Sequence, residues 1–285
     1  MCGIFALFSR DRASAPVLGA IAAVRHRGPD DEGTVVFAGD CAAPHVFAGP
    51  DTPAAMRTGR LPYLPGPQPG EHFPEGAFLA LAHRRLSILD LSEAGHQPMC
   101  SDGGRLWIAY NGEIYNHVEV RAELEALGHR FHSSSDTEVL LAAWLQWGRD
   151  ALQRLDGMFA FVLFDRAQRR LFAVRDRFGI KPLYFWVTPG GGLAFASEVK
   201  QFAALPGWRA RVNGQRVYDF LNWGILDHAS DTMFAGVGQL RNGEMIEVDL
   251  ARGPAVVQGA TLERRQWYAL AGAPFRSEEH TSELQ

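Results

Sequence analysis

Short apolar and aromatic segments recur through the first two hundred residues, and they constrain the fold more than any other feature of the sequence. Residues 158–176, MFAFVLFDRAQRRLFAVRD, contain two such segments around a polar turn, and residues 181–197, KPLYFWVTPGGGLAFAS, contain two more around a Pro-Gly turn. Two apolar runs joined by a short turn are typical of a β-hairpin. The sequence therefore predicts antiparallel pairs of strands in this region.

Three other segments also predict strands. Residues 3–8, GIFALF, form a short apolar and aromatic run that indicates a buried strand. Residues 77–91 predict a strand followed by a polar turn. Residues 105–116, RLWIAYNGEIYN, predict a strand that runs into a glycine turn at Asn111 and Gly112. The N-terminus is therefore expected to lie in a sheet.

Helices are fewer than strands. Residues 16–28 have the apolar spacing of a helix that Gly28 would close, and helices are also expected at residues 117–128 and 137–148. Two pairs of residues have the spacing of a capping box at the start of the later helices: Asn116 with Glu119, and Ser135 with Glu138. Many strands bracketed by few helices predict an α+β layered domain that spans residues 1–205.

Three segments fall outside this regular pattern. Residues 44–76 are rich in Pro and Gly and lack sustained periodicity, which predicts a long loop or an inserted excursion. Residues 206–275 are expected to form a linker and the first part of a second domain. Residues 276–285, RSEEHTSELQ, are polar and unlike what precedes them. They resemble the translated read-through of a sequencing adapter, so we expect the natural protein to continue differently.

The composition argues against several classes of protein. The formal net charge is −4 and the Lys and Arg residues are scattered, so no basic surface for nucleic acid is expected. No window is long and apolar enough for a membrane span, and the N-terminus lacks the features of a signal peptide. The cysteines Cys2, Cys41 and Cys100 form no CxxC pair, which argues against a zinc site and favours a reducing compartment. We expect a cytoplasmic protein without a metal centre.

Cys2 stands directly behind the initiator methionine. Removal of Met1 would give Cys2 a free α-amino group next to its thiol, which is a nucleophile with its own base. An α-amino group titrates at about pH 7.7 to 8.0 in model peptides, close to the pH at which a general base works well. Position alone nevertheless favours a plainer interpretation, a small buried residue at the start of a strand.

Attack on a carboxamide also needs donors for the developing oxyanion, and the Asn111 side chain and the Gly112 backbone N–H are candidates. An amino-acid substrate needs its carboxylate held, for which Arg85 is a candidate, and its ammonium group held, for which Glu113 and Asp136 are candidates. Each has a plainer interpretation on its own, as a hairpin turn, a salt bridge, a solvated turn residue or a helix cap. Only the combination favours catalysis.

Eight segments taken together resemble class II glutamine amidotransferases, and specifically the asparagine synthetases that hydrolyse glutamine. They occur in family order between Met1 and Lys200: MCGIFA, RHRGPDDEG, AHRRLSILDLS, YNGEIYNH, SDTEVLL, LDGMFAFVLFD, RDRFGIKPLY and FASEVK. The combination of RHRGPD, RLSI and NGEIYN is more specific to the asparagine synthetase branch than to the amidotransferases of sugar-phosphate or purine metabolism.

The resemblance implies an N-terminal-nucleophile hydrolase fold, a four-layer αββα sandwich in which two antiparallel sheets lie between helical layers. It also implies that the Cys2 thiol attacks the side-chain amide of L-glutamine, with the oxyanion donors and the clamps for both ends of the substrate at the residues named above. The residues in contact with glutamine would be Arg85, Leu86, Ser87, Ile88, Leu89, Asn111, Gly112, Glu113 and Asp136.

In full-length relatives the ammonia passes to a C-terminal synthetase domain, where ATP with Mg²⁺ activates aspartate for amidation. That domain carries an SGGxDS-type pyrophosphate loop. This sequence has none, because PGGGL at residues 189–193 has the position of a hairpin turn. The glutaminase part needs no cofactor, and this chain is expected to hydrolyse glutamine at most.

The sequence leaves several alternatives open. The 44–76 excursion departs from the shorter family members, so the acceptor could be a carboxylate other than aspartate, in a peptide or a cell-surface precursor. An N-terminal-cysteine acylase would share Cys2 but would not need the amino-acid clamp. A glutamine-binding domain that has lost catalysis would keep the clamp and release no ammonia. A homodimer is also open, since relatives are often dimers.

Overall fold

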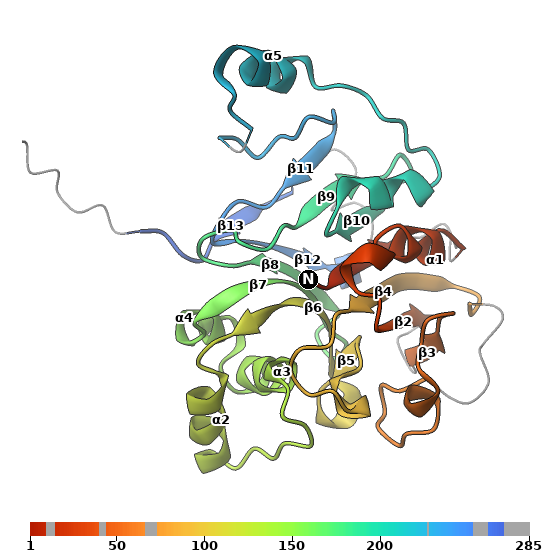
Figure 1. The fold of residues 1–285 in the computed structure, drawn as a ribbon, viewed down its shortest axis with the longest axis vertical. Helices are drawn as coiled ribbons and strands as arrows, with labels where there is room; N and C mark the ends of the chain where they lie inside the picture. Colours follow the sequence, from red (N-terminus) through yellow and green to blue (C-terminus); the bar gives the residue numbers. More distant parts are fainter. Residues whose placement is uncertain (10–14, 40–43, 66–72, 227, 253–261, 271–285) are drawn as a thin grey trace, which may run out of the picture.

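The computed structural model describes residues 1–9, 15–39, 44–65, 73–226, 228–252 and 262–270. Its strands form two antiparallel sheets that lie face to face, with helices on their outer surfaces (Figure 1). This arrangement confirms the αββα sandwich that the resemblance implied.

Each sheet is built from segments far apart in the sequence. Sheet A has, in spatial order, β11 (Val237–Gln239), β9 (Tyr184–Val187), β10 (Leu193–Ala196), β1 (Gly3–Phe8), β4 (Ala77–Arg85), β2 (Asp31–Ala38) and β3 (Pro44–Ala48). Sheet B has, in spatial order, β13 (Arg264–Gln266), β12 (Glu244–Asp249), β8 (Arg170–Arg175), β7 (Gly157–Asp165), β6 (Leu106–Ile114) and β5 (Met99–Cys100).

Helices cover the outer face of each sheet. On sheet A, α1 (Ala15–Ala22) packs against β1 and against the 3₁₀ segment Val199–Ala204. On sheet B, α3 (Asp136–Trp147) packs against β6 and β5. The remaining helices are α2 (His117–Ala126), α4 (Ala151–Arg154) and α5 (Gly214–Trp223), and further 3₁₀ turns lie at Arg25–Arg27, Ala54–Arg57, Glu93–Gly95, Asp102–Gly104, Gly148–Asp150 and Leu250–Arg252.

The central strands are buried on both faces, which explains their continuous apolar runs. In β1, Ile4, Ala6 and Phe8 belong to the core that includes sheet B, whereas Phe5 and Leu7 pack with α1. Because successive side chains of a strand point to opposite faces, one strand contributes to both cores. The N-terminal segment is thereby fixed in the middle of sheet A.

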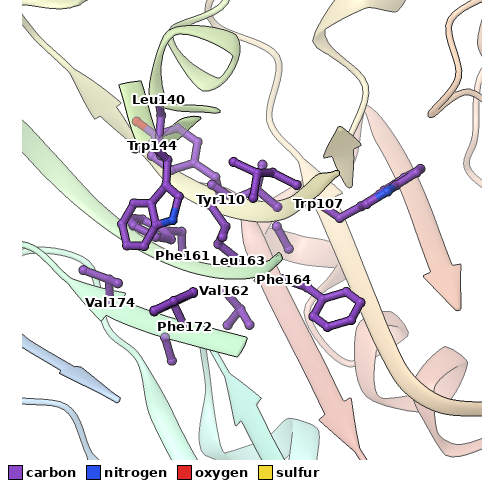
Figure 2. Packing of buried hydrophobic residues seen from close by; sticks show 14 of the residues in the cluster. Trp107, Tyr110, Leu140, Trp144, Phe161, Val162, Leu163, Phe164, Phe172 and Val174 are labelled. Atoms are coloured by element: carbon purple, nitrogen blue, oxygen red, sulfur yellow. The ribbon is translucent and has the colours of Figure 1, made fainter. Parts of the chain in front are cut away.

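Strand β7 shows the same division in sheet B (Figure 2). The Phe161 ring lies 5.8 Å from that of Trp144 on α3, measured between centroids, in an edge-to-face arrangement. Phe164 points the other way and meets Phe37 of sheet A with the centroids 4.8 Å apart. Edge-to-face aromatic pairs add to the stability that burial of apolar area provides.

The structure confirms the strand at residues 3–8 and both hairpins, which are β7 with β8 and β9 with β10. The PGGGL segment is the turn of the second hairpin, where the Thr188 N–H donates to the Gly192 carbonyl oxygen at 2.8 Å. Short loops and alternating burial made these elements predictable.

The predicted turn at Asn111 and Gly112 is wrong, because β6 runs straight through both residues to Ile114. A Cβ atom on Gly112 would lie 2.6 Å from the carbonyl oxygen of Met158 in the adjacent strand. The glycine is therefore required by a close approach between strands and not by a turn.

The predicted helix starts are correct, but some details differ. Helix α1 ends at Ala22, well before Gly28. Asn116 precedes α2, yet its side chain binds backbone groups on either side of Leu155 at 2.9 Å and caps nothing. Ser135 does cap α3 and accepts the Thr137 N–H at 3.1 Å. Local spacing thus located the helices better than it identified their caps.

Part of the 44–76 excursion is regular structure, which corrects the prediction of a loop there. Residues 44–48 form β3, which pairs with β2 at the edge of sheet A. Further along, the Tyr63 hydroxyl donates to the Ala94 carbonyl oxygen at 2.8 Å. Residues 66–72 of the excursion lie outside the described residues.

The sandwich continues past the predicted boundary at residue 205. Strand β11 pairs with β9 in sheet A, and β12 pairs with β8 in sheet B. By contrast, α5 has no buried residue and exposes Trp223 to 71%. The predicted adapter-like segment 276–285 and Cys41 lie outside the described residues. In the part of the chain that is described, no helix is long and apolar enough to cross a membrane.

Candidate active site

A cavity of about 220 Å³ lies between the N-terminal end of β1, the outer edge of β6 and the first turn of α3. Its volume suits a ligand of amino-acid size. All the residues predicted from the sequence except Ser87 line it: Cys2, Arg85, Leu86, Ile88, Leu89, Asn111, Gly112, Glu113 and Asp136. Ser87 is not part of the lining, and its backbone N–H donates to Asp30 Oδ2 at 2.8 Å.

Cys2 is held at the cavity by contacts on both its backbone and its sulfur. Arg27 Nε donates to the Cys2 carbonyl oxygen at 2.8 Å, and the same guanidinium pairs with Glu198 at 3.0 Å. The sulfur lies 3.4 Å from the Leu86 backbone nitrogen, which donates to it. The thiol is therefore fixed beside the loop that follows β4.

Burial raises the pKa of the Cys2 thiol, and the Leu86 N–H and nearby positive charges oppose this shift only in part. Such a thiol is mostly protonated at neutral pH, so attack on a carbonyl requires a base. Met1 still precedes Cys2 in this chain and is 55% exposed at the cavity. Its removal would put a primary amine directly beside the thiol.

The outer edge of β6 supplies backbone donors to the cavity. Strand β5 pairs with β6 only at Trp107 and Ile108. Farther along the same edge, the Tyr110 N–H donates to Gln97 at 2.8 Å and the Ile114 N–H donates to Asp136 at 3.0 Å. Because alternate residues of a strand direct their N–H groups to the same edge, the Gly112 N–H between them faces the cavity.

The Asn111 side chain is a second donor in the same place. It is 1% exposed, and its Nδ2 has no hydrogen-bond partner among the described residues. A buried amide left without a partner costs about 1–3 kcal/mol, so such groups in folded proteins commonly have a bound partner. The cavity thus holds a thiol and two N–H donors, a set that suits attack on a carbonyl with stabilisation of its oxyanion.

Two carboxylates lie on the opposite side of these donors. Asp136 begins α3, is buried, and accepts the Tyr110 hydroxyl at 2.7 Å. Burial raises the pKa of Asp136, which its hydrogen-bond donors oppose in part. Glu113 also lines the cavity. A ligand ammonium group here would meet two acceptors of opposite charge.

Arg85 supplies positive charge to the cavity but is also bound to the loop that follows it. Its guanidinium donates to the carbonyl oxygens of Leu89 at 3.2 Å, Ser92 at 3.4 Å and Asp90. Among the described residues it has no carboxylate partner. The buried cation therefore both shapes the loop and remains available to an anionic ligand.

The cavity has further lining residues that sequence reasoning missed: Met1, Gly95, Gln97, Tyr110, Ser135, Thr137, Met158 and Lys181. Burial lowers the pKa of Lys181. Lys181 lies in one of the segments that carry the resemblance, but a single sequence gives it no role. Gln97 lies in GHQPM, which matches no local motif. Three-dimensional proximity was the missing signal for both.

A metal centre has no visible ligand set. No group of three or more His, Cys, Asp or Glu side chains that could hold a metal ion occurs within the described ranges. Cys100 is buried in the hydrophobic core that the two sheets share, away from the Cys2 cavity.

Known proteins resemble the chain in both sequence and structure. Asparagine synthetase (glutamine-hydrolyzing) 3 of Bacillus subtilis strain 168 is 38% identical over 174 residues, which are 60% of this chain and 27% of that protein. Asparagine synthetase (glutamine-hydrolyzing) 1 of the same strain is 49% identical over 117 residues, 41% of this chain and 18% of that protein. The chain therefore spans less than a third of the length of these relatives.

Among solved structures, the glutamine phosphoribosylpyrophosphate amidotransferase of B. subtilis complexed with ADP and GMP superposes with a TM-score of 0.61 and 19% identity. The match covers 94% of this chain and 49% of that one, and at this identity it shows the fold. The family model for the glutamine amidotransferase domain matches residues 65–255, which leaves the place of Cys2 to the geometry above. Since that match covers more than half of its length, the chain belongs to the glutamine amidotransferase domain family.

Proposed function

We propose that this chain hydrolyses L-glutamine to glutamate and ammonia through a thioester on Cys2. The observation that carries the proposal is the cavity itself, in which a thiol, the unpartnered Asn111 amide and the Gly112 N–H lie together with two carboxylates and an arginine. Membership of the glutamine amidotransferase family supports glutamine as the substrate.

The chemistry begins after removal of Met1. The α-amino group of Cys2 takes the thiol proton, because burial keeps the thiol protonated until a base acts. The sulfur then bonds to the side-chain carbonyl carbon of glutamine, and the carbonyl electron pair moves to oxygen, where Asn111 Nδ2 and the Gly112 N–H donate to it.

Collapse of this tetrahedral intermediate breaks the carbon–nitrogen bond. The amino group of Cys2 returns its proton to the leaving nitrogen, and ammonia departs. Water then attacks the glutamyl thioester and releases glutamate, which restores the thiol. The same amine acts first as base and then as acid, as a positioned group near neutral pH can.

The two ends of glutamine are assigned by charge. The α-carboxylate would lie against Arg85 and the α-ammonium group against Glu113 and Asp136. The segment from Leu86 to Leu89, which contacts the cavity at all positions except Ser87, would form the wall along the side chain. Clamps at both ends distinguish a free amino acid from a simple amide.

We further propose that the ammonia serves ATP-dependent amidation of aspartate to asparagine in a longer cytoplasmic protein that contains this chain. The names of the two relatives support this acceptor, and both are more than three times the length that the chain matches. ATP with Mg²⁺ would bind in the further domain, and no cofactor would bind at Cys2.

Covalent labelling tests the first proposal directly. A diazo-ketone analogue of glutamine should add once, to Cys2, in protein that has lost Met1, and intact mass analysis should show both events. Cys2→Ala should abolish labelling and ammonia release, whereas Cys100→Ala, which alters a buried core thiol, should leave both in place. Labelling at another cysteine, or glutamine binding without ammonia release, would contradict the mechanism.

A further inference from the structure

Gln97 has no assigned role, yet it binds the edge of the strand that carries both oxyanion donors. Its Oε1 accepts the Tyr110 N–H at 2.8 Å, and its Nε2 donates to Thr137 Oγ1 at 3.3 Å. The residue is 6% exposed and lines the cavity. Both ends of its amide are therefore committed to protein partners.

These two bonds fix the orientation of the amide. If the amide were flipped, its NH₂ group would face the Tyr110 N–H, donor against donor, and its oxygen would face the Thr137 hydroxyl. Thr137 lies in the first turn of α3, next to Asp136. Gln97 thus links the edge of β6 to the start of α3.

The edge of β6 has three outward N–H groups, and only the middle one is left to a ligand. Gln97 takes the N–H of Tyr110 and Asp136 takes that of Ile114, which leaves the N–H of Gly112. A neighbouring strand would occupy all three groups, because an antiparallel partner bonds alternate residues. Two side chains in its place leave an opening one residue wide.

The carbonyl side of Tyr110 is fixed as well. His83 Nε2 lies 2.9 Å from the Tyr110 carbonyl oxygen, and burial lowers the pKa of His83 to about 3, so the imidazole is neutral at physiological pH. With its N–H on Gln97 and its carbonyl on His83, Tyr110 has both backbone groups held. The peptide that leads into Asn111 is thereby prevented from rotating.

We propose that Gln97 is a positioning residue for the oxyanion hole: its side-chain amide replaces a neighbouring strand at Tyr110 and so holds Asn111 and the Gly112 N–H in the orientation that the reaction needs. This inference rests on the proposed glutamine hydrolysis and adds to it a residue that touches the strand and not the reacting atoms. A misplacement of about 1 Å at such donors is sufficient to lower a rate about 100-fold.

The test compares Gln97→Met, which keeps the length of the side chain and removes its acceptor, with the unmodified protein. We expect kcat for glutamine hydrolysis to fall about 10- to 100-fold while KM stays within about threefold, because the clamps for the substrate ends are unchanged. Alkylation of Cys2 by iodoacetamide needs no oxyanion hole and should keep its rate. Gln146→Met, an exposed change on α3, is the matched control and should alter nothing.

Gln97→Glu provides a rescue. When protonated, the new carboxyl both accepts from Tyr110 and donates to Thr137, so the ratio of its kcat to that of the unmodified protein should rise as the pH falls from 8 to 6. An unchanged kcat in Gln97→Met, or a loss confined to KM, would overturn the proposal.

Two outcomes remain to be separated. If Gln97→Met does not fold, Thr137→Val decides, because it removes the acceptor that fixes the amide and should lower kcat severalfold with KM preserved; an unchanged kcat there would overturn the proposal. If the unmodified protein releases no ammonia and does not label at Cys2, the proposed function fails and not the role of Gln97 alone.

Discussion

At the level of single residues, the cavity combines groups whose protonation opposes their use. Burial raises the pKa of both the Cys2 thiol and the Asp136 carboxyl. Asp136 keeps its charge through the Tyr110 hydroxyl, the Ile114 N–H and the N-terminus of α3. Cys2 has one donor at 3.4 Å and no adjacent base until Met1 is removed. Processing of the N-terminus is therefore the step that would activate the site.

The first prediction concerns the reactivity of the Cys2 thiol. Since the thiolate is the reactive form and burial raises the thiol pKa, a chain that retains Met1 should react with iodoacetamide at pH 7.5 more slowly than the same chain unfolded in urea. Its rate should rise with pH to a midpoint above the ordinary value of about 8.5. The trimmed chain should react faster at pH 7.5, and a midpoint below 8.5 in the untrimmed chain would contradict the effect of burial.

Single residues also show where one sequence is sufficient. Cys2, Asn111 and Asp136 were identified because their chemistry is unusual at those positions and the segments around them resemble a family. Gln97 and Lys181 were not, because an amide or a lysine in a polar segment is ordinary until the fold places it against the cavity. The role of Gly112 as a donor was predicted for the wrong backbone, a turn in place of a strand.

At the level of elements, one loop joins the two walls of the cavity. Asp90 follows β4 with a φ of 48°, a left-handed conformation that Asp tolerates better than most residues. Its Oδ1 accepts the Ser92 N–H at 3.1 Å, and its Oδ2 accepts the Ser134 N–H, just before α3, at 2.8 Å. The segment after Arg85 is thus tied to the segment that carries Asp136.

Asp90→Ala is expected to raise KM for glutamine about tenfold, with a smaller change in kcat, because the wall and Arg85 lose their link to α3. Steady-state kinetics measure the split, and Asp90→Asn, which keeps one acceptor, should lie between. Burial acts to raise the pKa of Asp90, but hydrogen bonds from Ser92 and Ser134 outweigh it and lower that pKa. The link should therefore hold at neutral pH and weaken only when the pH falls below the ordinary range of an aspartate, about 3.9. Equal losses in kcat and kcat/KM would show that the loop is not a binding element.

Elements differ in how far local sequence determines them. The hairpin of β7 and β8 is apparent from its apolar runs and polar turn, since both strands are buried. Strand β3 is not, because an edge strand that begins with Pro44 inside a Pro- and Gly-rich segment depends on β2 for its pairing. The same applies to β5, which has two residues.

At the level of the whole molecule, the sandwich is closed by segments late in the chain. Strand β12 covers the edge of β8 and buries Met245, Ile246 and Val248. The Arg175 guanidinium reaches across to the Leu240 carbonyl oxygen at 2.5 Å. The sequence suggested a boundary at residue 205 because the strands beyond it are short and separated by polar segments. Their partners lie tens of residues earlier, which local patterns do not reveal.

A pair of shortened chains tests this closure. A chain that ends at Leu205 loses β11 and β12, and with them several buried apolar side chains that each contribute about 1.5–3 kcal/mol. The total is comparable to the 5–15 kcal/mol that typically stabilises a folded domain, so this chain should show no cooperative thermal unfolding and should aggregate through the exposed edge of β8. A chain that ends at Leu270 keeps every described strand and should unfold with the midpoint of the 285-residue chain. Circular dichroism and size-exclusion chromatography distinguish the two, and cooperative unfolding of the shorter chain would mean that residue 205 is a true domain boundary.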